Sequence, residues 1–134
     1  MISTVQWNHK IFTAGAPGFG ELSLEIFRFQ YHYNPVYKAY VDALGVDISR
    51  VSHISQVPYL PVRLFKTREV KTTSFDPAIV FESSGTTGMV NSRHFIKDIS
   101  LYEESFLHTF RLFYGDPGQW CIIGLLPSYL ERNN

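Results

Sequence analysis

The chain has 134 residues, which corresponds to about one domain of ordinary size. Its 12 Lys and Arg residues balance its 12 Asp and Glu residues, and this neutrality argues against a dedicated nucleic-acid binder. A hydrophobic content of 45% excludes a disordered chain. The single cysteine, Cys121, excludes an internal disulfide and a cysteine-rich zinc site.

The amino terminus contains no basic region followed by an apolar run, so it does not have the form of a secretory signal. No segment approaches the roughly 20 apolar residues that span a bilayer. We therefore expect a single domain in the cytoplasm, without a membrane span.

The pattern of residues 1–76 predicts a helical and irregular segment that precedes the strand, loop, helix and strand of residues 77–134. Lys10–Thr13 is predicted to be a short extended segment. Apolar residues at helical spacing predict a helix from Glu21 to Tyr33, which ends where Asn34 precedes a proline. A second helix is predicted over Val36–Leu44, ended by a glycine, and Val62–Phe65 is predicted to be a strand near a sheet edge.

Residues 77–134 are predicted to follow the order strand, loop, helix, strand. Ala78–Phe81 is a short apolar run typical of a buried strand, and Ser100 to Glu103 has the form of a capping box that opens a helix. Trp120–Leu126 is apolar almost throughout, which is typical of a strand buried on both faces, and Cys121 within it is expected to be a buried, inert thiol. This order predicts an α/β fold with layered helices on a mostly parallel sheet.

A loop rich in hydroxyls and glycines follows the first predicted strand. Glycines let the backbone turn tightly, so that several amides point into one concavity that binds anionic oxygens. The loop is therefore a candidate phosphate site, with Arg93 and His94 as possible charge partners. The alternative is an ordinary Ser/Thr/Gly turn between two strands. The six loop residues are Ser83, Ser84, Gly85, Thr86, Thr87 and Gly88.

Other chemical motifs are absent from the sequence. The glycines of Gly15–Gly20 have the spacing of a nucleotide phosphate loop, but Glu21 stands where that motif needs lysine. The chain has no G-x-S-x-G elbow, and its five histidines lack metal-ligand spacing. The sequence thus predicts no metal site and identifies no catalytic residue.

Residues 79–88, with the sequence Ile-Val-Phe-Glu-Ser-Ser-Gly-Thr-Thr-Gly, resemble the phosphate-loop signature of the adenylate-forming superfamily. Residues 26–31, 100–106, 113–115 and 125–132 are similar to one branch, the bacterial luminescence-type acyl-protein synthetases, or long-chain-fatty-acid–luciferin-component ligases. The resemblance covers most of the chain and implies the N-terminal portion of an adenylate-forming domain.

The resemblance implies activation of a fatty acid with ATP and magnesium, followed by acyl transfer to a protein thiol. The implied partners are a carboxylic acid, ATP, and a protein acyl acceptor or acyl reductase. Ser83 to Gly88 would hold the β- and γ-phosphates, and Tyr129 would lie near the acyl pocket. Met89–Ser92 occupies positions where most acyl-CoA synthetases have Pro-Lys, a departure shared by the luminescence-type branch.

The superfamily's adenine- and magnesium-binding segments and its catalytic lysine lie downstream of the matched region. We therefore expect a fragment of a larger enzyme that is inactive by itself. The alternative is a non-catalytic binding or self-assembly module that keeps the phosphate loop and self-associates through open sheet edges.

Overall fold

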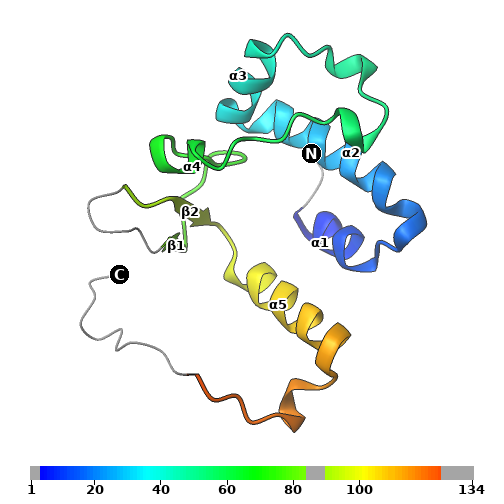
Figure 1. Ribbon diagram of the computed structural model, residues 1–134, viewed down its shortest axis with the longest axis vertical. Helices are drawn as coiled ribbons and strands as arrows, with labels where there is room; N and C mark the ends of the chain where they lie inside the picture. The colour runs from blue at the N-terminus through cyan, green and yellow to red at the C-terminus, as the bar shows by residue number, and fades with distance from the viewer. Residues whose placement is uncertain (1–3, 84–89, 125–134) are drawn as a thin grey trace. The chain divides into compact units, whose positions relative to one another are not determined.

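The computed structural model describes residues 4–83 and 90–124 of the chain (Figure 1). The chain divides into two compact units, Met1–Lys97 and Asp98–Asn134. The helices are α1 (Thr4–Thr13), α2 (Phe19–Tyr33), α3 (Pro35–Ala43), α4 (Leu64–Thr67) and α5 (Ile99–Tyr114), and the strands are β1 (Ile79–Glu82) and β2 (Arg93–Ile96). Four single 3-10 turns, Ala16–Gly18, Ile48–Arg50, Ile54–Gln56 and Pro117–Gln119, complete the described elements.

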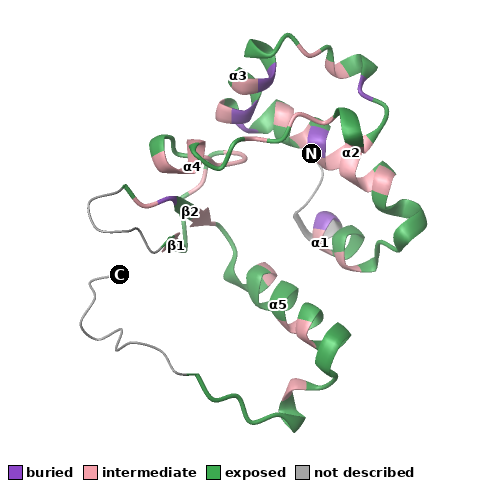
Figure 2. Ribbon diagram, in the orientation of Figure 1, coloured by how far each residue is buried: buried purple, intermediate pink, exposed green. Residues whose placement is uncertain are grey.

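The core of the first unit lies between α2, α3 and the segment that follows α3, where the buried residues gather in Figure 2. Val41 is fully buried, and the rings of Phe27 and Tyr37 meet edge to face with centroids 6.2 Å apart. Val51 closes the cluster from the segment after α3. Such a cluster holds two short helices together, because neither is long enough to be stable alone in water.

Asn34 forms the junction between α2 and α3. Its backbone N–H donates to Gln30 O at 2.8 Å, and its side-chain oxygen accepts from Tyr37 N at 3.0 Å, so the residue ends one helix and caps the next. Gly45, with φ +67°, follows the end of α3. Both predicted helices of this region are confirmed to within two residues at each end.

Two predictions in the first unit are wrong. Lys10–Thr13 is the last part of α1 and not an extended segment. This helix is fixed by contacts distant in sequence, since Trp7 packs against Phe29 with ring centroids 5.4 Å apart and Lys10 pairs with Glu25 at 2.8 Å. Local alternation of residue types carries no information about such contacts.

The strand predicted at Val62–Phe65 is also wrong, because these residues form a turn and the start of α4. Leu64 N donates to Pro61 O at 2.9 Å, and Phe65 N donates to Val62 O at 3.1 Å. These bonds between near neighbours turn the chain immediately after the proline. Short α4 then lies beside β2 (Figure 1).

The strands β1 and β2 form an antiparallel hairpin. Their register pairs Ile79 with Ile96 at one end and Glu82 with Arg93 at the other. The predicted strand at Ala78–Phe81 is thus confirmed with its bounds shifted by one residue, but its predicted burial is wrong. Ile79 and Val80 are exposed, because a hairpin of two strands covers few of its own side chains. The described residues combine helices with this two-stranded sheet, and the predicted parallel sheet is not found among them.

The second unit contains α5. Its N-cap is Asp98, whose Oδ1 accepts from Ser100 N at 2.9 Å and from Ser100 Oγ at 2.7 Å. The predicted helix is confirmed, but the predicted cap at Ser100 is wrong, because a carboxylate two residues earlier takes that role. Gly115, at φ +78°, follows the last helical residue.

The strand predicted over Trp120–Leu126 is wrong for its described part. Residues 120–124 have no regular structure and are exposed, Cys121 included, so this thiol is not the buried one that we expected. An apolar strand needs partners on both faces, and the described residues of the second unit include no buried side chain. In the described parts of the chain, no helix is both long and apolar enough to cross a membrane.

Candidate functional site

The two strands of the β1–β2 hairpin are joined by hydrogen bonds at the base of the predicted phosphate loop. Ser83 N donates to Ser92 O, and Ser92 N donates to Ser83 Oγ, each at 3.0 Å. This pair of bonds extends the ladder one step beyond Glu82 and Arg93 and holds the two ends of the loop together. Ser83 is therefore at the base of the loop, where its hydroxyl oxygen already accepts a hydrogen bond. The other five predicted loop residues, Ser84 to Gly88, lie outside the described residues.

Arg93 and His94 are placed on opposite faces of β2, because consecutive residues of a strand alternate. The imidazole of His94 stacks on the ring of Phe65 in α4, with centroids 4.8 Å apart and planes at 17°. The guanidinium carbon of Arg93 lies 5.4 Å from the centroid of Phe95. The two predicted charge partners thus do not share a face, and Arg93 is the one on the face with further cations.

Lys71 and Lys97 join Arg93 around two phenyl rings. Lys71 Nζ lies 5.3 Å from the centroid of Phe75 and 5.7 Å from that of Phe95. Lys97 Nζ lies 6.0 Å from the centroid of Phe75. We call Lys71, Arg93, Lys97 and these two rings the cationic face. Cations over ring faces are attracted by the ring quadrupoles, so these rings gather three positive charges without neutralising them.

The sequence contains a signal for this face in the distribution of its charges. Residues 63–97 contain half of the cations but a quarter of the acids: Arg63, Lys66, Arg68, Lys71, Arg93 and Lys97 against Glu69, Asp76 and Glu82. The charges before residue 72 form a locally positive stretch, which is typical of a solvated loop and also compatible with a surface that faces an anion. No local pattern indicates that Lys71 returns to β2, so the sequence alone does not join this residue to Arg93.

Lys71 is held in place by two polar partners. Its ammonium pairs with Glu69 and donates to Phe75 O at 3.2 Å, and only 22% of its side chain is exposed. The hydrogen bond from Lys71 and the nearby positive charges of Lys71 and Arg93 lower the pKa of Glu69. Glu69 is thus the carboxylate that balances part of the positive charge of the cationic face.

The loop that carries Lys71 is anchored to the helical core. Thr73 N donates to Tyr33 O at 2.7 Å, and Asn34 Nδ2 donates to Thr72 Oγ1 at 3.3 Å. Thr73 has φ +73°, which is rare for a β-branched residue and is kept only where surrounding contacts enforce it. The core thereby fixes the backbone that presents Lys71 to β2.

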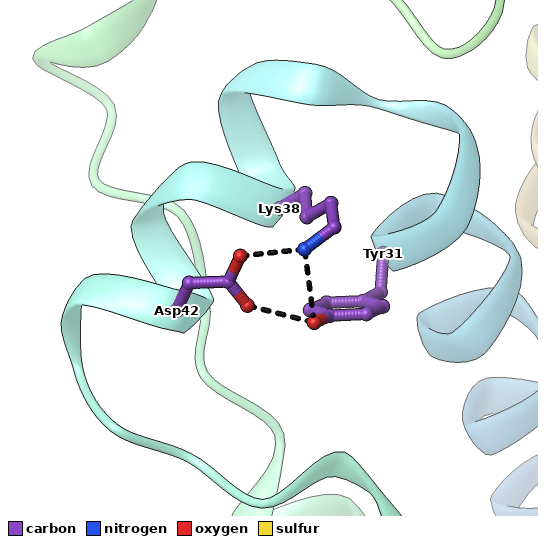
Figure 3. Close-up of polar contacts among 3 residues, drawn as sticks. All are labelled: Tyr31, Lys38 and Asp42. Atoms are coloured by element: carbon purple, nitrogen blue, oxygen red, sulfur yellow. Dashed lines mark hydrogen bonds and ion pairs between the residues drawn. The ribbon is translucent and has the colours of Figure 1, made fainter.

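A second group of titratable side chains links α2 to α3 (Figure 3). Tyr31 donates to Asp42 Oδ1 at 2.7 Å, and Lys38 donates to Asp42 Oδ2 at 2.6 Å and to the Tyr31 hydroxyl at 3.2 Å. Hydrogen bonds to Asp42 and Tyr31 raise the pKa of Lys38, and those from Lys38 and Tyr31 lower the pKa of Asp42. Lys38 and Asp42 are about half exposed to solvent, so we assign this group to helix packing.

Two further questions are whether residues could hold a metal ion and where the predicted acyl-pocket residue lies. Among the described residues, no three His, Cys, Asp or Glu side chains lie close enough to hold a metal ion. Tyr129, the predicted acyl-pocket residue, lies outside the described residues.

Comparisons with known proteins identify no relative. No protein-family model, no curated protein and no solved structure matches the chain.

Proposed function

We propose that the chain is the N-terminal part of an ATP-dependent ligase that activates fatty acids, and that Ser83 to Gly88 receive the β- and γ-phosphates of ATP. The observation that carries the proposal is the pair of bonds between Ser83 and Ser92, which closes a hairpin directly beneath this loop. The resemblance of residues 79–88 to adenylate-forming enzymes supports it independently. Under this proposal, the hairpin belongs to a larger α/β domain with a mostly parallel sheet.

The proposed reaction has two steps. A carboxylate oxygen of the acid attacks the α-phosphorus of ATP, the bond to the bridging oxygen of the β-phosphate breaks, and pyrophosphate leaves. A protein thiolate then attacks the acyl carbon, and AMP leaves with the electron pair of the C–O bond. Backbone amides and hydroxyls of the loop would stabilise the negative charge that develops on pyrophosphate in the first step.

Under this proposal, the chain serves to bind the phosphates. Magnesium would neutralise phosphate charge during the first step, and the superfamily's magnesium-binding segment lies downstream of the region that this chain resembles. We therefore propose that the 134-residue chain binds phosphates and does not catalyse acid activation. A carboxylate-dependent exchange of pyrophosphate into ATP, measured on the purified chain, would contradict this proposal.

Binding of pyrophosphate and ATP to the chain, measured by calorimetry, tests the loop directly. Gly85→Val should weaken both ligands by about tenfold or more, since a β-branched residue restricts the backbone that presents the amides. Gly20→Ala is the matched control, because Gly20 lies in α2 and an added Cβ there meets no atom within 4 Å. Equal affinities for the two variants would show that the loop is an ordinary turn and does not bind the phosphates.

A second candidate function is a non-catalytic module that self-assembles through its sheet. One observation favours it: within the described residues, the hairpin has two strands only, so the outer edge of each strand is unpaired. Size-exclusion chromatography over a range of concentrations tests this candidate. A reading frame that continues past Asn134 into an acidic magnesium-binding segment and a distal lysine would favour the ligase.

A further inference from the structure

We infer that the cationic face, Lys71, Arg93 and Lys97 around Phe75 and Phe95, binds a polyphosphate anion, and that Glu69 competes with this anion for Lys71. The inference rests on the proposed function and deepens it, because it assigns the charge that the phosphate loop itself lacks. Arg93 lies immediately after Ser92, which closes the base of that loop.

The cations of this face retain capacity for a ligand. Within the described part of the chain, Arg93 and Lys97 form no ion pair within 4.0 Å. Their contacts are with rings, and a ring leaves the N–H groups at the edge of a guanidinium or ammonium available to an anion. Three donors spread around two rings fit an extended anion with several oxygens better than a single carboxylate.

The backbone around the face is fixed before any ligand arrives. Lys71 is placed by the loop that Tyr33 and Asn34 anchor to the core, whereas Arg93 belongs to the hairpin and Lys97 directly follows β2. A preorganised set of cations loses less conformational entropy on binding than flexible surface lysines do.

Glu69 is the carboxylate that such a ligand has to displace from Lys71. It pairs with Lys71, and its own side chain is about half exposed. Glu82 lies opposite Arg93 in the register of the hairpin and receives a weak hydrogen bond from Asn91 at 3.4 Å. A ligand with more negative charge than one carboxylate can replace Glu69, because attraction to all three cations acts on the same anion.

Calorimetric titration of the full 134-residue chain with inorganic pyrophosphate at low ionic strength tests the inference. We expect Arg93→Met and Lys97→Met each to weaken binding by about tenfold. Glu69→Gln should strengthen it, since Lys71 is then no longer paired with a carboxylate. Arg63→Met is the control for net charge, because Arg63 is exposed and its guanidinium lies over neither Phe75 nor Phe95.

The outcomes separate this inference from the proposed function. If Arg93→Met and Lys97→Met bind pyrophosphate as Arg63→Met does, while Gly85→Val abolishes binding, the cationic face is not the site and the loop proposal stands. If the cation variants weaken binding and Gly85→Val does not, the face stands and the loop proposal fails. A wild-type chain that binds no pyrophosphate overturns both. Thermal melting without ligand establishes that each variant is folded.

Discussion

The α2–α3 core and helix α5 use similar residues and reach opposite degrees of burial (Figure 2). In the core, Phe27, Tyr37 and Val41 are nearly inaccessible to solvent. In α5, no described side chain is buried, although Phe106 and Phe113 have the same aromatic character. A groove of about 490 Å³ follows the apolar side of α5, and it is lined by residues such as Phe110, Tyr114 and Ile122.

The difference shows that helix formation and burial are separate steps. Both helices have apolar residues at helical spacing, and each ends at a local signal, Asn34 for α2 and Gly115 for α5. Burial requires a partner surface. α2 has one in α3 and in the segment that contains Val51, whereas the described residues of the second unit supply none that covers α5.

Replacing one phenylalanine in each region should give the largest contrast. Phe27→Ala is expected to lower the free energy of unfolding by about 3–5 kcal/mol, because it removes a buried ring and leaves a cavity in the core. Phe113, which is 75% exposed, is the matched position, and Phe113→Ala should change stability by less than about 0.5 kcal/mol. Denaturant unfolding of both variants measures the two effects. Similar losses would mean that α5 is covered in solution.

Removing the Tyr37 hydroxyl should have an intermediate effect. This hydroxyl donates to Pro58 O at 2.7 Å, so Tyr37→Phe leaves a carbonyl without its donor, at a cost of about 1 kcal/mol. Burial, more than the nearby Tyr40 and Tyr59, raises the pKa of Tyr37 to about 12. The unfolded chain therefore ionises this residue near pH 10 and the folded chain does not, so stability should fall as the pH rises from about 10 towards 12.

Unfolding measured between pH 9 and pH 12 checks this prediction. The part of the pH dependence that comes from Tyr37 should disappear in Tyr37→Phe. Tyr114→Phe is the control, because Tyr114 is exposed and is not among the groups that raise the pKa of Tyr37. An identical pH profile for wild type and Tyr37→Phe would show that the buried hydroxyl does not titrate differently in the two states.

The sequence predicted those features that depend on near neighbours. Asn34 before a proline and Gly45 after an apolar stripe are local signals, and both marked helix ends correctly. The position of the strand before Ser83 was also predicted from a short apolar run, although its exposure was not. Each of these features requires only that a few consecutive residues prefer one backbone conformation.

Features that depend on distant residues were not predictable in the same way. α1 is fixed by the contact of Trp7 with Phe29, and Lys71 reaches β2 through a loop anchored at Tyr33. The opposite faces of Arg93 and His94 could have been predicted from strand alternation, had the strand been assigned. The apolar run from Trp120 was misread because hydrophobicity indicates a need for partners and does not show that partners are present.

Two aspartate caps with the same hydrogen bonds, one in each unit, allow a direct comparison of the two regions. Asp47 in the first unit and Asp98 at the start of α5 each accept from the backbone N–H and the hydroxyl of a serine two residues later. In both cases these serine contacts lower the pKa of the carboxyl. The local chemistry is the same, so any difference between the effects of removing the two caps reports on the surroundings.

We expect Asp98→Ala to destabilise the first turn of α5, whereas Asp47→Ala should leave its 3-10 turn in place. Ile48, inside that turn, packs against the core, and α5 has no comparable support among the described residues. Amide hydrogen exchange at Leu101 and Tyr102 measures the effect in α5, and exchange at Arg50 and Val51 measures it in the first unit. Lowering the pH of the wild type should reduce hydrogen-exchange protection in the first turn of α5, as Asp98→Ala does. Because the carboxyl pKa is lowered in the folded state, its stabilisation is present above pH 3.8 and is lost as the pH falls through the folded value. Equal protection in the two variants would show that α5 is held by packing as firmly as the core.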